Sequence, residues 1–346
     1  MEVFLNYPDI DEYTAETFHL LGNTFRDRGE VDRALRVHQN VIARSNLSAK
    51  QKQRAMFALG QDFFAAGMLD RAESVFQELL DSNSKWISKS SICESLRTIY
   101  EQTQEWQKAI EATHCSKKSL KKTDVNENAS KLDSLITHYY CELADESLQK
   151  GNLHEVDGFI TKAKKSYKES TRLMSLQGDI AFHQEQYKES LSHYLSAVKQ
   201  DSRLLSMLFN KIDESAKKAG ETQYLQKKLL VMHQEQQDNN VFEAILQLAD
   251  KYGADHEIDK LVDEVLGKKK LSIKSIYQAS GYVKDKAESE NYVEPSQGVG
   301  LVKIHKSLEN HLQGVPSFRC EHCGYKMHDY LWRCPACNHW DTVDQA

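Results

Sequence analysis

One internal repeat constrains the fold of this chain more than any other feature. The segments FHLLGNTFRDRGEVDRALRVHQ and MFALGQDFFAAGMLDRAESVFQ begin at Phe18 and Met56. Each carries a Leu-Gly pair, an aromatic residue three positions later, a second glycine and then an alanine. Small residues such as Gly22 and Gly60 let two antiparallel helices approach closely, and the second glycine supplies the turn between them. The repeat therefore predicts stacked helical hairpins.

The same frame continues along most of the chain. Further copies are predicted around Ala109, Val156 and Gly178, and residues 201–285 keep helical periodicity without the small-residue pattern. This combination is typical of tetratricopeptide repeats. We therefore expect an all-α tetratricopeptide-repeat solenoid of antiparallel helix pairs over residues 1–285, with degenerate pairs at its end.

Three segments are expected to interrupt or end this array. The lysine-rich stretch 116–131 is predicted to be an exposed loop. In these repeats the second helix carries an aromatic residue at a fixed distance after the first glycine. Counting back one repeat from Gly22 puts this aromatic position at Phe4, so the first repeat is expected to be truncated. Residues 286–315 are predicted to form a linker and a short helix over 301–312. The linker is predicted because the sequence before this helix is polar and contains Pro295.

The last segment, residues 316–346, contains two C-x-x-C pairs. These are Cys320 with Cys323 and Cys334 with Cys337. Each tight turn brings two sulfurs to one side, and two turns complete a tetrahedral site of four thiolates. Because so short a segment cannot bury enough surface to fold alone, we expect one structural metal ion in a rubredoxin-like or zinc-ribbon module. Zinc is the commoner ion in such sites and iron the alternative.

Other residues near this module and in the repeats are open to two interpretations. His322, His328 and His339 are expected to be solvated or supporting side chains, although a ligand exchange or a proton shuttle is the alternative. The remaining cysteines are scattered, which favours a reducing compartment over a disulfide framework. Cys93 is predicted to be a buried, unreactive thiol, and Trp86 and Trp106 are predicted to pack in the core.

Composition and motifs exclude several function classes. The net charge of −6 argues against bulk attraction to nucleic acid or anionic lipid. No run of about 18 apolar residues and no signal peptide is present, so the chain as written is expected to be soluble and cytoplasmic. No phosphate-binding loop, nucleophile elbow or metalloprotease motif occurs, and four thiolates leave no open metal position. We therefore expect a protein that is not an enzyme.

A repeat array presents the first helix of each pair on one face, which can capture a peptide or a helix. The outward positions of the first three such helices are the candidate partner-binding groove: His19, Asn23, Arg26, Phe57, Gln61, Phe64, Glu94, Thr98 and Glu101.

The repeats and the two C-x-x-C turns (knuckles) that follow them resemble a known family. Six segments between about Phe18 and Trp340 carry the resemblance: LGNTFRDRGEVDRALRVHQ, LGQDFFAAGMLDRAESVFQELL, EWQKAI, YYCELA and the terminal CEHCG and YLWRCPACNHW. They are similar to the lipopolysaccharide assembly protein B family of Gram-negative bacteria. The resemblance implies a tetratricopeptide protein with a rubredoxin-type domain, anchored by an N-terminal helix on the cytoplasmic face of the inner membrane. It implies that the four cysteines are the metal ligands. Because the first repeat is expected to be truncated, we expect the family's anchor helix to be absent from this chain.

The resemblance also implies partners. They are the deacetylase of the lipid A pathway, the membrane-bound AAA metalloprotease that degrades it, and proteins of lipopolysaccharide export or regulation. Our leading hypothesis is an adaptor in which the metal module folds back on the repeats, because the spacer HLQGVPSF is short. Homo-oligomers are compatible with this hypothesis.

Two other classes of function are alternatives to the adaptor. A nucleic-acid-binding zinc ribbon is disfavoured, because residues 316–346 carry three basic against four acidic side chains. An electron-transfer protein with an iron centre of four sulfurs predicts a coloured, redox-active preparation.

Overall fold

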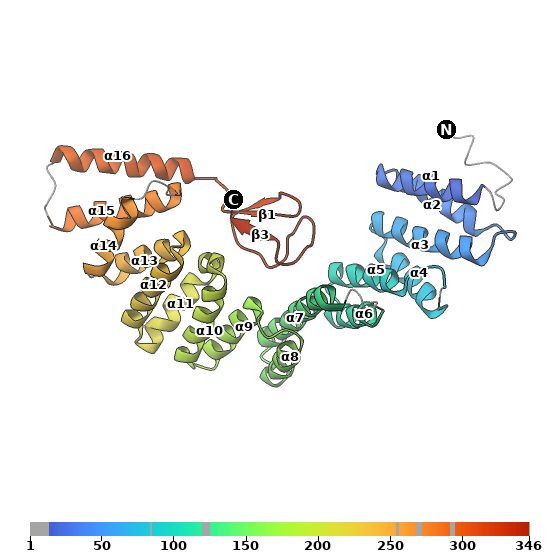
Figure 1. The fold of residues 1–346 in the computed structure, drawn as a ribbon, viewed down its shortest axis with the longest axis horizontal. Coiled ribbons are helices and arrows are strands. Elements are labelled where there is room, and N and C mark those ends of the chain that lie inside the picture. Colours follow the sequence, from blue (N-terminus) through green and yellow to red (C-terminus); the bar gives the residue numbers. More distant parts are fainter. Residues whose placement is uncertain are drawn as a thin grey trace. The chain divides into compact units, whose positions relative to one another are not determined.

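The computed structural model describes residues 14–83, 85–119, 125–253, 256–267, 272–290 and 295–345. In these ranges the chain forms successive antiparallel helices and one small sheet near its C-terminus (Figure 1). The predicted all-α array with a small C-terminal module is confirmed. The chain divides into two compact units, residues 1–168 and 169–346, which are described separately. The prediction made for Phe4 lies outside the described residues, and so do residues 120–124 of the expected loop 116–131.

The first unit is a series of helix pairs. Every helix contacts the next one along the chain, and the first helices of successive pairs, α1, α3 and α5, also contact one another. The helices are α1 (Ala15–Asp27), α2 (Val31–Ile42), α3 (Ala49–Ala65), α4 (Leu69–Asp81), α5 (Lys89–Gln102), α6 (Trp106–Lys118), α7 (Val125–Gln149) and α8 (Leu153–Ser166).

The glycines of the repeat occupy the positions that the sequence predicts. A Cβ at Gly60 of α3 would lie 2.7 Å from the ring of Phe76 on α4, so only glycine allows this approach. Gly29 and Gly67, which join the helices of the first two pairs, have φ values of 77° and 72°. Residues with side chains rarely adopt this left-handed conformation, which explains glycine at the turns.

Three expectations for the first unit were wrong in detail. Trp86 is 52% exposed, because it lies in the turn between α4 and α5 rather than on a helix. Trp106 is buried, as predicted. The expected loop 116–131 is largely helical, since α6 continues to Lys118 and α7 begins at Val125. Cys93 is buried, but it forms a disulfide with Cys115, because α5 and α6 bring the two Cα atoms to 6.0 Å.

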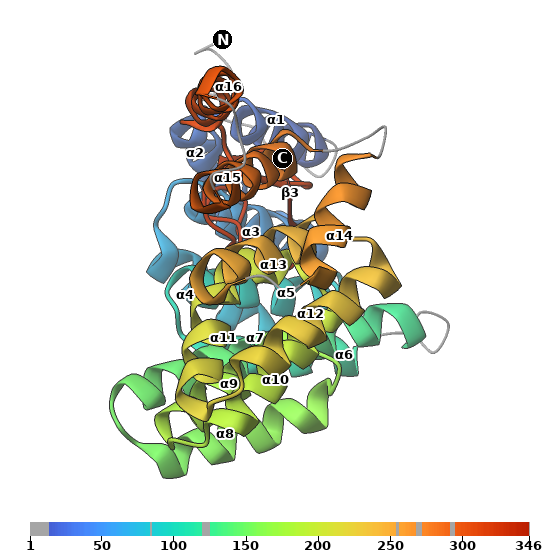
Figure 2. The same ribbon diagram turned by 90° about the vertical axis from the view of Figure 1, so that its left-hand side faces the viewer.

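The second unit continues the helix pairs and ends in a three-stranded sheet. Figure 2 shows α15 and α16 side by side, as in the first view, and the two helices are in contact. The elements are α9 (Thr171–His183), α10 (Tyr187–Gln200), the 3₁₀-helix η2 (Ser202–Leu204), α11 (Leu205–Ala219), α12 (Thr222–Gln236), α13 (Asn239–Tyr252), α14 (His256–Leu266), α15 (Ile273–Glu290), α16 (Pro295–Leu312), β1 (Phe318–Cys320), β2 (Lys326–Met327) and β3 (Val343–Gln345).

The segment expected to be a linker is mostly helical. Helix α15 continues to Glu290, and α16 begins at Pro295 rather than near residue 301. Proline is compatible with the first position of a helix, where its missing N–H would have no intrahelical partner. The proline therefore marks the start of α16 and not a structureless segment.

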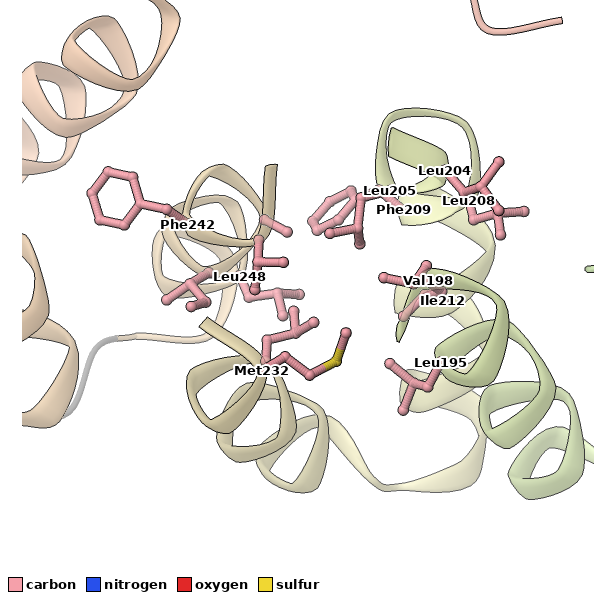
Figure 3. Close-up of a cluster of buried hydrophobic side chains, with 14 of the residues drawn as sticks. Leu195, Val198, Leu204, Leu205, Leu208, Phe209, Ile212, Met232, Phe242 and Leu248 are labelled. Carbon is pink, nitrogen blue, oxygen red and sulfur yellow. The ribbon is translucent and has the colours of Figure 1, made fainter. Parts of the chain in front are cut away.

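The second unit has one large hydrophobic core. It joins side chains of α10, η2, α11, α12 and α13, some of which are labelled in Figure 3. The same cluster includes residues of the sheet module, among them Phe318, Met327 and Tyr330. Burial of a large apolar side chain contributes about 1.5–3 kcal/mol to stability. The module is therefore packed on the helices by a shared core.

Candidate metal centre

The C-terminal module is a small antiparallel sheet that carries two cysteine turns. Strand β1 is central and pairs with β2, Phe318 opposite Met327, and with β3, Cys320 opposite Val343. The side chains of Phe318 and Cys320 are buried, and the intervening Arg319 is exposed. This alternation is that of a strand with one face on a core. It fixes the first cysteine on the inner face.

The two cysteine turns have the same backbone hydrogen bonds. In the first turn, the Cys320 carbonyl accepts from the Gly324 N–H, and the Cys320 N–H donates to the Tyr325 carbonyl, both at 2.8 Å. In the second, the Cys334 carbonyl accepts from the Asn338 N–H at 2.9 Å, and the Cys334 N–H donates to the His339 carbonyl at 2.9 Å. Gly324 and Asn338 have φ values of 75° and 60°.

This correspondence explains the residue type at each turn. Glycine adopts a left-handed conformation without strain, and asparagine is among the few other residues that tolerate it. Gly324 directly follows the first cysteine pair, where a tight turn favours glycine. The equivalent role of Asn338 was missed, although its position four residues after Cys334 matches that of Gly324 after Cys320.

The four sulfurs of the turns lie together. The Sγ atoms of Cys320 and Cys337 are 3.6 Å apart, those of Cys323 and Cys334 are 3.7 Å apart, and all four lie within 4.8 Å of one another. A tetrahedron with metal–sulfur bonds of about 2.3 Å has edges of about 3.8 Å. The cluster thus fits a structural metal-binding knuckle.

The surroundings of the cysteines shift the pKa values of two of their thiols in opposite directions. Burial raises the pKa of the Cys320 thiol, but hydrogen bonds from the Thr342 hydroxyl and from the backbone of Cys323 and His322 outweigh it and lower that pKa to about 6. Burial and the neighbouring sulfurs raise the pKa of Cys337 to about 12. Four adjacent thiolates repel one another, and the positive charge of a coordinated metal ion offsets this repulsion, so that each ligand stays deprotonated.

The module contacts the helices through charged and aromatic side chains as well as through the core. Arg172 of α9 is buried, with its guanidinium 5.3 Å from the ring centroid of Trp340 and 6.0 Å from that of Trp332. Arg203 of η2 forms an ion pair with Asp344 at 3.2 Å. A cation over an aromatic ring contributes about 0.5–2 kcal/mol, more when it is shielded from water. These contacts fix the module against the start of the second unit.

The predicted groove residues lie on α1, α3 and α5, which are neighbours in the first unit. His19, Asn23 and Arg26 of α1 are half-buried and linked to one another by hydrogen bonds of 3.4 and 3.0 Å. Phe57, Gln61 and Phe64 of α3 are half-buried, and on α5 Glu94 is exposed and Thr98 is half-buried.

One of these predictions was wrong. Glu101 is only 4% exposed, accepts a hydrogen bond from the Tyr139 hydroxyl and forms an ion pair with Arg97 at 2.7 Å. A buried carboxylate held by two partners stabilises the contact between helices, so Glu101 does not present itself to a ligand.

A buried charged cluster near the groove was missed. Asp62 is fully buried on α3 and lies 2.9 Å from the guanidinium of Arg26 and 2.5 Å from Nδ1 of His38 on α2. His38 occupies the position that Phe76 and Tyr194 take in other repeats, 16 residues after the glycine. A histidine in an aromatic position was the signal that an acidic partner was nearby.

The second unit contains a cavity, with apolar as well as polar side chains in its lining, that the sequence did not indicate. It has a volume of about 490 Å³ and is lined by α13, α15 and the end of α16, up to Phe318 of the metal module. A smaller cavity of about 200 Å³ shares Asn240, Glu243 and Lys274 with it. Glu243 is buried and 2.8 Å from Lys274, and burial raises its pKa. The lining supplies amides, hydroxyls and one ion pair.

Among the helices of the described ranges, none is long and apolar enough to span a membrane.

Comparison with protein families agrees with the two parts of the architecture. Residues 318–345 match a family model described as a rubredoxin metal binding domain. Residues 17–50 match a tetratricopeptide repeat model.

The chain is also similar to curated proteins along most of its length. It is 27% identical to lipopolysaccharide assembly protein B of Escherichia coli strain K12, over 99% of this chain and 84% of that protein. It is 29% identical to lipopolysaccharide assembly protein B of Haemophilus influenzae, over 93% of this chain and 77% of that protein. Among solved structures, a tetratricopeptide repeat protein from Parabacteroides merdae covers 85% of this chain, with 14% identity and a TM-score of 0.39, a weak likeness that says nothing of function.

Proposed function

Because the chain is a relative of lipopolysaccharide assembly protein B along almost its whole length, as the repeats and knuckles predicted, we propose that it is a non-enzymatic adaptor in lipopolysaccharide assembly. Its helices supply a rigid surface for other proteins, and its metal module completes that surface. The proposal assigns it to the cytoplasmic face of the bacterial inner membrane, where the precursor of lipid A is made.

One observation carries the adaptor proposal. The metal module shares a hydrophobic core with α10 to α13 and lies against Arg172 and Arg203. A module that hung freely from the chain would share no core with these helices and would contact neither arginine. Because the module and the helices are one packed body, a metal ion that folds the module also shapes the surface beside it.

Two surfaces are proposed to hold partners. One is the face of α1, α3 and α5 in the first unit, without Glu101. The other is the larger cavity of the second unit, whose wall includes Phe318 and several polar side chains. Side-chain amides such as that of Asn240 pair with the N–H and C=O groups of an extended peptide, so this cavity suits a peptide segment of a partner.

The partners proposed are those of the related family. The adaptor binds the deacetylase that commits precursor to lipid A, presents it to the membrane-bound AAA metalloprotease, and couples synthesis to export. Cys320, Cys323, Cys334 and Cys337 hold one structural ion, with zinc favoured over iron because closed sites of four thiolates inside cells most often hold zinc.

The test replaces two ligands and follows the partner. In the chain with Cys334→Ser and Cys337→Ser, affinity capture from native membranes should lose the deacetylase, and the deacetylase should be degraded more slowly in cells. Cys141→Ala is the matched control, because Cys141 is a buried cysteine of the first unit outside the cluster. It should behave as the unmodified chain.

Metal analysis and circular dichroism accompany the test. The unmodified chain should be colourless with one zinc ion, and the helices of both variants should remain. Unchanged capture and turnover in a metal-free, helical chain would show that the module takes no part in partner binding. A coloured protein with one iron ion would replace zinc in the proposal.

A further inference from the structure

We propose that one edge of the first unit binds the surface of a membrane that contains anionic phospholipids. This edge carries four exposed lysines, Lys50, Lys85, Lys89 and Lys118, and one exposed aromatic residue, Trp86. We name these five residues the basic edge. The inference rests on the proposed function only for the location of the chain at the inner membrane.

The fold gathers the basic edge from separate segments of the chain. Successive helices of the unit run in opposite directions, so the starts of α3 and α5 and the ends of α4 and α6 lie at one edge of the array. Lys50 is the second residue of α3, and Lys89 is the first of α5. Lys85 and Trp86 lie between α4 and α5, and Lys118 ends α6.

Contacts and a shared hollow connect these residues. The Lys50 Nζ lies 5.8 Å from the ring centroid of Trp86, although 36 residues separate the two in the sequence. Lys89 and Lys118 line the same surface hollow, which has a volume of about 760 Å³. The lysines and the tryptophan therefore form one continuous surface rather than scattered positions.

Trp86 is the apolar part of this surface. It is 52% exposed, in a turn where the helices leave it uncovered. Tryptophan is enriched at the level of lipid headgroups, because its ring is apolar and its N–H remains hydrogen-bonded there. Lysines beside it place their carbon stems along the apolar layer and their ammonium groups among the phosphates. Trp86 between lysines has this arrangement.

The charge of the basic edge is available to a ligand. Within the described part of the chain, none of its four lysines forms an ion pair, whereas the neighbouring Lys117 pairs with Asp133. Two carboxylates oppose the lysines, since Asp81 ends α4 at this edge and Glu111 lines the hollow. Positive charge predominates at the edge, which makes it complementary to an anionic surface.

The negative charge of the whole chain does not prevent this attraction. The net charge of −6 is a sum over all residues, but in salt a charge acts over only about 10 Å. A lipid surface that touches the edge therefore meets the lysines and not the average of the chain. Each lysine near an anionic membrane strengthens binding about fivefold. The exposed tryptophan and the proposed location favour a lipid surface over nucleic acid.

The experiment measures sedimentation of the purified full chain with lipid vesicles. The chain should bind vesicles of phosphatidylcholine mixed with phosphatidylglycerol, should not bind phosphatidylcholine alone, and should be released by added salt. Lys85→Gln/Lys89→Gln should weaken binding about 25-fold. Arg28→Gln/Lys150→Gln is the matched control, because it removes the same charge from exposed residues at the opposite edge, and it should bind as the unmodified chain does.

Trp86→Ala tests the apolar contact separately. In the unmodified chain, tryptophan fluorescence should shift to shorter wavelength on binding the mixed vesicles, because the ring of Trp86 leaves water. The variant should lose this shift and bind several-fold more weakly. Circular dichroism should show that all variants keep their helices, since the replaced side chains are exposed.

Several results would overturn the inference. Equal binding to both kinds of vesicle, or equal weakening in the two double variants, would show that the basic edge is not the membrane contact. A short RNA that binds as tightly as the mixed vesicles, with no effect of Trp86→Ala on either, would make the edge a nucleic-acid site instead. The assay contains no partner protein, so failure to bind vesicles would leave the adaptor proposal standing, and its own capture test decides that proposal.

Discussion

At Gly22, Gly60 and Gly178 the distance between the two helices of a pair is set by a missing methyl group, since a Cβ at each would meet a ring of the partner helix. This part of the fold could be predicted from the sequence, because the small residue and the ring opposite it are in the same short hairpin. Glu101 could not be placed in this way. Its partner Tyr139 lies 38 residues away on the next pair, and only the packed structure shows that the carboxylate is buried.

Replacing Gly60 by alanine tests the close approach. The added methyl group would lie 2.7 Å from Phe76, so the helices must move apart, which should lower the free energy of unfolding by about 1–3 kcal/mol. Gly158→Ala is the control, because Gly158 lies in α8 with open space around it. That change should raise stability by up to about 1 kcal/mol. Urea denaturation measures the free energy of unfolding of both variants. Equal changes in this free energy for Gly60→Ala and Gly158→Ala would rule out the packing explanation.

At the scale of elements, periodicity identified helices better than it identified their ends. Pro295 was interpreted as a linker residue, but it is the first residue of α16. Trp86 was predicted to pack in the core, but it lies in the turn between α4 and α5. Helix existence depends on many side chains, whereas an end depends on one or two local bonds. The rings of His322 and His339 stack with their centroids 3.7 Å apart. This contact was missed for a related reason, since no pattern in the sequence connects two turns 17 residues apart.

The disulfide between Cys93 and Cys115 connects the two helices of one pair, α5 and α6, with a separation of 22 residues. A cross-link that closes a loop of this length restricts the unfolded chain and stabilises the fold by about 3 kcal/mol. Cys115→Ser should therefore lower the free energy of unfolding of oxidised protein by about that amount. With a reductant present, the variant and the unmodified chain should unfold at nearly the same denaturant concentration.

Alkylation provides the direct check on this bond. In denaturant with a chelator, five of the seven cysteines of the oxidised chain should react, and all seven after reduction. Seven reactive cysteines without reduction would show that the two thiols are merely neighbours, and the difference in stability should then be absent.

At the scale of the whole molecule, the sequence correctly separated a repeat array from a metal module, because the two parts have different composition and spacing. The division into units at residue 168 was not indicated, since the repeat pattern continues across it. The core that the module shares with the helices could not be predicted from the sequence either. In the sequence, nothing distinguishes Phe318, Met327 and Tyr330 from apolar residues that pack only within a small module. The short spacer between Leu312 and Phe318 was the one sequence feature that favoured their packing on the helices.

Removal of the metal ion should therefore affect more than the module. A strong chelator takes away the ion that folds residues 318–345, and the module then releases Phe318, Met327 and Tyr330 from the core of the second unit. Each fully buried side chain of this kind contributes about 1.5–3 kcal/mol, so α10 and α11 should open several kcal/mol more easily.

Hydrogen exchange measured by mass spectrometry locates the effect. Amides of α10 and α11 should exchange faster in the chelated chain, whereas amides of α3 and α4, which belong to the core of the first unit, should be unchanged and serve as an internal control. Restoring the ion should restore protection, because the same contacts re-form. If the module alone lost protection and α10 and α11 did not, the core would be divided at the module boundary, and the metal ion would shape only the segment that binds it.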